Sequence, residues 1–204
     1  MAALLQSLEK TLAAGLVLVV VVIILFGLIS GSWISLSGSW WFDFLFRWLH
    51  IWFGILWIGL LYYFNFVQTP SMPKIPDPEK PAITKVIAPT ALFYFRWAAL
   101  LTVIMGLIIA IGKGYIVNAL TLNLVKTGST GHAAIGLGMW LGLIMAYNVW
   151  MIIWPNQQKV LGLVDCPADQ KPAAARVAGM ASRINTMLSL PMLFCMVAET
   201  HGGL

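Results

Sequence analysis

The chain has 204 residues, of which 60% are hydrophobic and only 9% are charged, and its mean hydropathy is +0.89. Soluble domains carry about 25% charged residues, so this composition excludes a soluble globular protein and indicates an integral membrane protein. The net charge of +5 reflects a basic excess that membrane proteins place mostly in cytoplasmic loops, so we expect membrane lipid as a partner and no nucleic acid.

The first predicted element is a membrane-spanning helix over the aliphatic run Leu12–Ser30. Its apolar core is longer than the roughly 7–15 residues of a signal-peptide core, and no clear A-x-A cleavage site follows it, so we expect a retained helix. With the loop after it, this helix is expected to be a peripheral part, residues 1–38, of a single membrane domain. Residues 39–204 are expected to form the bundle of that domain.

Four further apolar runs approach or exceed the roughly 20 residues that a membrane helix needs. They are Trp41–Val67, Ala91–Ile111, His132–Trp154 and Ala178–Glu199. The proline-rich segments QTPSMPKIPDPEKPAITK and PNQQKVLGLVDCPADQKPAA are predicted to be loops, because proline cannot continue a regular helix. The predicted fold class is therefore an all-α integral membrane protein with five transmembrane helices, the second to fifth forming a four-helix bundle.

The distribution of basic residues predicts the orientation of this bundle in the membrane. With the N-terminus in the cytoplasm, the inner side holds Lys10, Lys74, Lys80, Lys85, Arg96, Lys159, Lys171, Arg176 and Arg183, and the outer side holds only Arg47, Lys113 and Lys126. Because cytoplasmic loops carry the excess of Lys and Arg, we expect a cytoplasmic N-terminus and an outward C-terminus.

All three histidines then fall in or near the outer leaflet. His50 stands in the otherwise apolar run RWLHIWFGILWIGLLYYFN, His132 opens the fourth predicted helix, and His201 follows the fifth. Ionisable side chains inside a membrane are costly and are usually functional, so this clustering points to a site.

The second and fourth predicted helices share a pattern. His50 is followed by Gly54 and His132 by Gly136, which places each glycine one turn from its histidine on the same helix face. A glycine there leaves room for a flat macrocycle, and two neutral imidazoles supply axial nitrogens to a haem iron. We therefore predict non-covalent haem b on His50 and His132, with His201 as the alternative second ligand; the chain has no C-x-x-C-H sequence for covalent attachment.

Two other interpretations of the pattern remain open. The histidines can serve another metal or cofactor, or they can simply be hydrogen-bonded inside the bundle. The glycines also include Gly138-x-x-x-Gly142, a small-residue spacing typical of ordinary packing between membrane helices.

A second polar set lies toward the predicted cytoplasmic ends of the helices. Its candidate site residues are Asn65, Arg96, Asn148, Arg183 and Asn185. Arginine pairs well with carboxylates, so the set is interpreted as a site for an anionic substrate or a haem propionate. The alternative is that the two arginines only extend to the membrane interface.

Several segments resemble a known family. RWLHIWFGILWIGLLYYFN, FRWAALLT, NVWMIIWPNQQK and SRINTMLSLPMLFCMV followed by His201 are similar to the membrane domain of the PuuD-type urate hydroxylase family, also called the urate oxidase N-terminal family. The resemblance covers roughly residues 40–201. It implies a bacterial inner-membrane protein that oxidises urate to 5-hydroxyisourate and passes electrons to cytochrome c. The sequence to Leu204 contains no cytochrome c module, so the resemblance favours a membrane redox fold more than urate as the substrate.

The segment LHIWFGILWIGLLY is also similar to the HemJ-type protoporphyrinogen oxidase, a small haem-binding membrane protein, and that similarity reaches His50 only. Three functions follow from these observations. The first is a haem b protein that passes electrons to a periplasmic cytochrome c, alone or with other membrane subunits. The second is a urate hydroxylase that uses a separate cytochrome c, and the third is a non-catalytic accessory subunit of a membrane complex.

Overall fold

The computed structural model describes residues 5–31, 39–125 and 132–201, with only the backbone described for residues 39–41 and 199–201. Within these ranges every regular element is helical, and five helices are long and apolar enough to cross a membrane. They are Leu8–Ser30, Phe42–Lys74, Lys80–Gly112, Ala133–Leu161 and Lys171–Ala198. The predicted fold class, an all-α membrane protein with five spanning helices, is confirmed.

The chain divides into two compact units, residues 1–44 and residues 45–204, with the boundary inside helix α3. The first unit contains α2, Leu8–Ser30, which begins four residues before the predicted start. It ends at Gly31, whose φ of 65° is the left-handed conformation that terminates a helix and that glycine adopts at low cost. Apolar residues occupy every face of α2, which is typical of a membrane-spanning helix.

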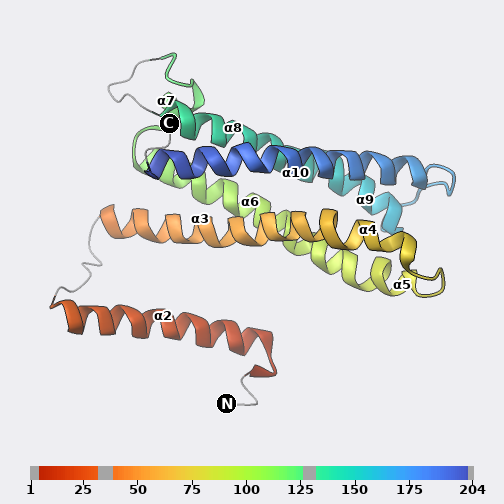
Figure 1. The fold of residues 1–204 in the computed structure, drawn as a ribbon, viewed down its shortest axis with the longest axis horizontal. Helices are drawn as coiled ribbons and strands as arrows, with labels where there is room; N and C mark the ends of the chain where they lie inside the picture. Colours follow the sequence, from red (N-terminus) through yellow and green to blue (C-terminus); the bar gives the residue numbers. More distant parts are fainter. Residues whose placement is uncertain (1–4, 32–38, 126–131, 202–204) are drawn as a thin grey trace. The chain divides into compact units, whose positions relative to one another are not determined.

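The second unit is built around four long helices (Figure 1). These are α3 (Ser39–Tyr62) with its extension η1 (Tyr63–Gln68), α6 (Ala88–Gly112), α8 (Ala133–Tyr147) with η4 (Asn148–Ile153), and α10 (Lys171–His201). Shorter elements join them: α4 (Thr69–Ser71), η2 (Met72–Lys74), α5 (Lys80–Ala82), η3 (Ile83–Ile87), α7 (Ile116–Leu120) and α9 (Trp154–Leu161). In Figure 1, α7 lies at one end of the unit, whereas α4, α5 and α9 lie at the other.

The prediction that prolines end the second helix near Val67 is wrong, because helical turns continue through Pro70 to Lys74. Each of the π-helical segments η1, η3 and η4 is followed two residues later by a proline, namely Pro70, Pro89 or Pro155. Proline lacks an N–H and clashes with the carbonyl four residues before it. In all three cases that carbonyl lies within the π segment, whose wider turn accommodates the ring and lets the helix continue.

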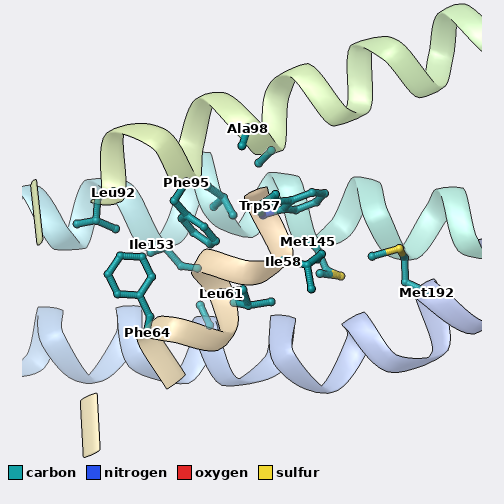
Figure 2. Packing of buried hydrophobic residues seen from close by; sticks show 13 residues of the cluster. Trp57, Ile58, Leu61, Phe64, Leu92, Phe95, Ala98, Met145, Ile153 and Met192 are labelled. Atoms are coloured by element: carbon teal, nitrogen blue, oxygen red, sulfur yellow. The ribbon is translucent and has the colours of Figure 1, made fainter. Parts of the chain in front are cut away.

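The core of the second unit lies where its four long helices meet (Figure 2). It is formed by Trp57, Ile58, Leu61, Phe64, Leu92, Phe95, Ala98, Ala99, Met145, Val149, Ile153, Ala181 and Met192. Figure 2 shows Trp57, Leu61 and Phe64 pointing from α3 and η1 into the space between the other helices. Large side chains on one helix and small ones such as Ala98 on another let the layers interdigitate.

One face of α10 is hydrogen-bonded to α3 and η1 through Ser182 and Ser189, which lie two helical turns apart. Ser182 accepts a hydrogen bond from Asn65 Nδ2 at 2.8 Å. Ser189 donates its hydroxyl hydrogen to the carbonyl of Thr186, so the Tyr62 hydroxyl must be the donor in its 2.9 Å contact with Ser189 Oγ. Hydrogen bonds of this kind join helices in lipid, where an unpaired polar group is costly.

Candidate functional site

His50 is held against α6 by its imidazole ring. Its Nδ1 lies 2.8 Å from the backbone carbonyl oxygen of Thr102. A carbonyl can only accept, so Nδ1 carries the proton and donates it, and Nε2 is left as the nitrogen with a lone pair. This is the tautomer that metal-binding histidines adopt when a backbone carbonyl orients them.

Gly106 makes room for this ring. A Cβ atom at Gly106 would lie 2.9 Å from Cε1 of His50, closer than real Cβ contacts, and 3.1 Å from Nδ1, which is a tight contact. Gly54 also faces α6, since a Cβ there would meet the Thr102 methyl at 3.8 Å. His50 and Gly54 therefore lie on the same face of α3, as their spacing predicts. The contribution of Gly106 was not predicted, because it depends on a contact between two helices.

His132 lies in different surroundings, directly before α8. Its ring stacks on Tyr115 with centroids 4.9 Å apart and planes 21° apart. Asn123, in the turn that follows α7, adopts the left-handed conformation with a φ of 61°. With its amide oxygen turned toward α8, Asn123 accepts hydrogen bonds from the backbone N–H of His132 and Ala133 at 3.0 and 3.1 Å. This arrangement satisfies N–H groups that the start of a helix leaves without partners.

Gly136 is used for close packing between α7 and α8. A Cβ at this position would clash with the backbone carbonyl of Ala119. The space that a macrocycle would need directly beside Gly136 is therefore filled by the backbone of α7. Gly138 packs against Cys195 and Met196 of α10, whereas a Cβ at Gly142 would meet no atom within 4 Å. In the pair Gly138-x-x-x-Gly142, therefore, only Gly138 lies in close contact with another helix.

His50 and His132, the two predicted ligands whose side chains the structure describes, differ in their surroundings. His50 contacts α6, and His132 stacks on Tyr115. His201 is the last residue of α10, and its side chain lies outside the described residues. No group of three or more His, Cys, Asp or Glu residues able to hold a metal ion occurs in the described part of the chain.

The second predicted polar set divides into three separate environments. Asn148 and Asn185 pair with each other, Nδ2 of Asn148 donating to Oδ1 of Asn185 at 2.8 Å. Asn185 Nδ2 in turn donates to the carbonyl oxygen of Met145 at 2.9 Å. Both amides are buried, so these two residues join α10 to α8 and η4.

Arg96 packs against the rings of Trp150 and Trp154. Its guanidinium carbon is 3.1 Å from the ring centroid of Trp154 and 5.7 Å from that of Trp150. Trp150 also meets Trp97 edge to face, with centroids 5.7 Å apart. The positive charge is stabilised by the negative faces of these rings. The buried Nε of Arg96 has no hydrogen-bond partner among the residues that the structure describes.

Asn65 and Arg183 are the two members of the set that share a cavity. This cavity, of about 370 Å³, lies between η1, the first part of α6, the junction of η4 and α9, and α10. Its polar lining consists of Asn65, Gln68, Thr69, Gln157, Arg176, Ser182 and Arg183. Its apolar lining includes Phe64, Leu92, Phe95 and Ile153. The cavity belongs to the end of the unit at which α10 begins.

Arg176, Ser182 and Gln157 were not among the predicted site residues. A signal for Arg176 was present, because it precedes Arg183 by two helical turns and so lies on the same face of α10. Arg96, Asn148 and Asn185 do not line the cavity, because their side chains are engaged in the contacts described above.

The later part of the chain matches a known protein family. Residues 107–203, just under half of the chain, match the family model described as urate oxidase N-terminal. The matched segment contains His132, Arg176 and Arg183, whereas His50, Asn65 and Gln68 precede it. No curated protein and no solved structure matches the chain.

Proposed function

We propose that the chain is a haem b-binding membrane redox protein that passes electrons toward a periplasmic cytochrome c. The observation that carries the proposal is the geometry of His50. Its Nδ1–H is bound to the carbonyl of Thr102, and Gly106 provides the space in which the ring sits. The ring is thereby fixed with Nε2 as the nitrogen that can bind iron.

The donor set is chemically suited to haem. Neutral imidazole is the usual axial ligand of b-type haem, and His50 lies within the candidate membrane span Phe42–Lys74. When bound, haem supplies reversible one-electron chemistry, which membrane electron transfer requires. The second axial ligand is His132 or His201. The protein can perform this role alone or as a subunit of a larger membrane complex.

The reduced-minus-oxidised absorbance spectrum of the purified full chain, expressed with ample haem, tests the proposal. We expect a b-type spectrum that is lost in His50→Gly and is restored by added imidazole, because a free imidazole can occupy the space that the side chain vacates. Imidazole rescue separates a ligand from a residue that only stabilises the fold. The second ligand is identified by comparing His132→Ala with His201→Ala.

A wild-type protein that shows no b-type absorbance would contradict the proposal. If such a haem-free protein co-purifies with other membrane subunits in fixed ratio, an accessory role becomes the better explanation.

A second candidate function is urate hydroxylation with a separate cytochrome c as the electron acceptor. The match of residues 107–203 to the urate oxidase N-terminal family loosely supports a urate-related redox role. Of the five residues predicted to bind an anionic substrate or a propionate, Asn65 and Arg183 line the same cavity, and Arg96, Asn148 and Asn185 do not. Loss of urate absorbance in the presence of oxidised cytochrome c tests this function. We expect Arg183→Gln to impair it more than Arg96→Gln.

A further inference from the structure

The guanidinium of Arg96 is a positive charge without a counter-ion among the described residues. It stacks on the ring of Trp154 and lies near that of Trp150. It forms neither an ion pair nor a hydrogen bond with any other residue that the structure describes. The elements that carry these three residues, α6, η4 and α9, contain no Asp or Glu. A cation in a membrane-spanning segment is costly without a partner, so an anion from outside the chain would stabilise it.

The sequence around Trp154 indicates how deep this charge lies in the membrane. The apolar segment VWMIIW ends at Trp154, and the polar segment PNQQK follows directly in α9. Tryptophan is enriched where the hydrocarbon core meets the lipid headgroups. We therefore expect Trp154, and the guanidinium that stacks on it, to lie at the depth of the lipid phosphate groups.

An apolar surface continues from this point along the membrane span. Met151 and Tyr147 precede Trp154 by about one and two helical turns, and both are exposed. On α6, the exposed ring of Trp97 meets Trp150 edge to face, with centroids 5.7 Å apart. A ligand that carries an acyl chain can cover this surface, whereas a soluble anion would leave it uncovered.

We infer that Arg96, Trp150 and Trp154 form a binding site for the phosphate group of a membrane phospholipid. The guanidinium presents two parallel N–H donors to the phosphate oxygens, and the tryptophan rings hold it in place. The acyl chains lie against Met151 and Tyr147. A lipid with a net negative headgroup is favoured, because a zwitterionic headgroup brings its own cation to the phosphate.

This lipid site is separate from the cavity between η1 and α10, since none of its three residues lines that cavity. It is also independent of haem binding by His50, which the optical spectrum tests. Failure of either proposal therefore leaves the other standing.

Native mass spectrometry of the full chain tests the inference, in micelles that contain equal amounts of phosphatidylglycerol and phosphatidylcholine. We expect wild type to retain phosphatidylglycerol in preference to phosphatidylcholine. Arg96→Gln should weaken this retention by about tenfold or more, the effect of losing a hydrogen bond to a charged group. Arg96→Lys should weaken it less, because the charge remains and only the planar fork is lost. Trp154→Leu should weaken it because the guanidinium is no longer held.

Arg176→Gln is the matched control, because Arg176 is also a cation of a candidate membrane span but lines the cavity instead. Thermal unfolding in the same micelles identifies any variant that does not fold. If Arg96→Gln is such a variant, Arg96→Lys and Trp154→Leu decide the result. The inference is overturned if the folded variants at positions 96 and 154 retain phosphatidylglycerol as wild type does, or if Arg176→Gln loses it equally. Displacement of the lipid by an equal concentration of inorganic phosphate would also overturn it.

Discussion

His50 on α3 and Gly106 on α6 form a matched pair, in which the imidazole ring occupies the space that any larger residue at position 106 would fill. The bond from Nδ1 to the carbonyl of Thr102, one turn earlier on α6, fixes the rotation of the ring. Two consecutive turns of α6 thus determine where Nε2 points.

Replacing Gly106 with alanine should therefore displace the His50 ring and break its bond to Thr102. Overpacking of this kind costs about 1–3 kcal/mol, which exceeds the gain of up to about 1 kcal/mol that alanine has over glycine in a helix. We expect a lower free energy of unfolding, together with a weakened or shifted b-type spectrum if His50 binds haem. Gly59→Ala is the control, because a Cβ at Gly59 meets no atom within 4 Å. An equal change in the free energy of unfolding of Gly106→Ala and Gly59→Ala would contradict the close contact between His50 and Gly106.

Gly136→Ala should be more damaging than Gly106→Ala. At Gly136 the new Cβ would meet the backbone of Ala119, which cannot rotate away as a side chain can. We expect a loss of more than about 2 kcal/mol in the free energy of unfolding, because α7 must shift as a whole. Gly142→Ala, on the same helix and in open space, should be neutral or slightly stabilising. Thermal unfolding of both variants in the same detergent makes the comparison, and a mild Gly136→Ala variant would be evidence against the close approach.

The pair Asn148 and Asn185 should show energetic coupling. Either single change to leucine leaves one buried amide without its partner, whereas the double change removes both. We expect a coupling energy of about 0.5–2 kcal/mol, in line with hydrogen bonds between membrane helices. A double-mutant cycle of unfolding free energies measures it. Additive single changes would show that the hydrogen bond contributes nothing net.

Removal of the ring over Arg96 should weaken the junction of α6 and α9. Trp154→Leu abolishes the closer cation–π contact and should lower the free energy of unfolding by about 0.5–2 kcal/mol. The comparison is Trp52→Leu, since Trp52 is exposed and contacts the neighbouring Phe53. If the contact with Arg96 is the cause, Trp154→Leu should not lower the free energy of unfolding in a protein that already carries Arg96→Gln.

Much of the architecture was predictable from local patterns. Apolar run length identifies five spanning helices, because a bilayer requires about 20 apolar residues whatever their partners are. The spacing from His50 to Gly54 correctly places both on one face of α3, since helical periodicity is a local property. Proline was misleading at Pro70 and Pro155, because its effect depends on whether the preceding turn can widen into a π segment.

The candidate sites depended on contacts between distant segments. The sequence grouped Asn65, Arg96, Asn148, Arg183 and Asn185 by their depth in the membrane, and depth does not determine which way each residue faces. Packing decided that Asn148 and Asn185 satisfy each other, that Arg96 lies against Trp154, and that Asn65 and Arg183 share a cavity.

By itself, the sequence determined that this is an all-α membrane protein with five spanning helices, because the hydrophobicity and periodicity of a helix are properties of contiguous residues. Only the tertiary structure decided that Gly106 accommodates His50 and that Gly136 packs against Ala119. It also decided that Arg176 joins Arg183 and Gln68 at one cavity. The physical reason is that such contacts form across helices far apart in sequence, where the size and shape of the opposing surface select the partner.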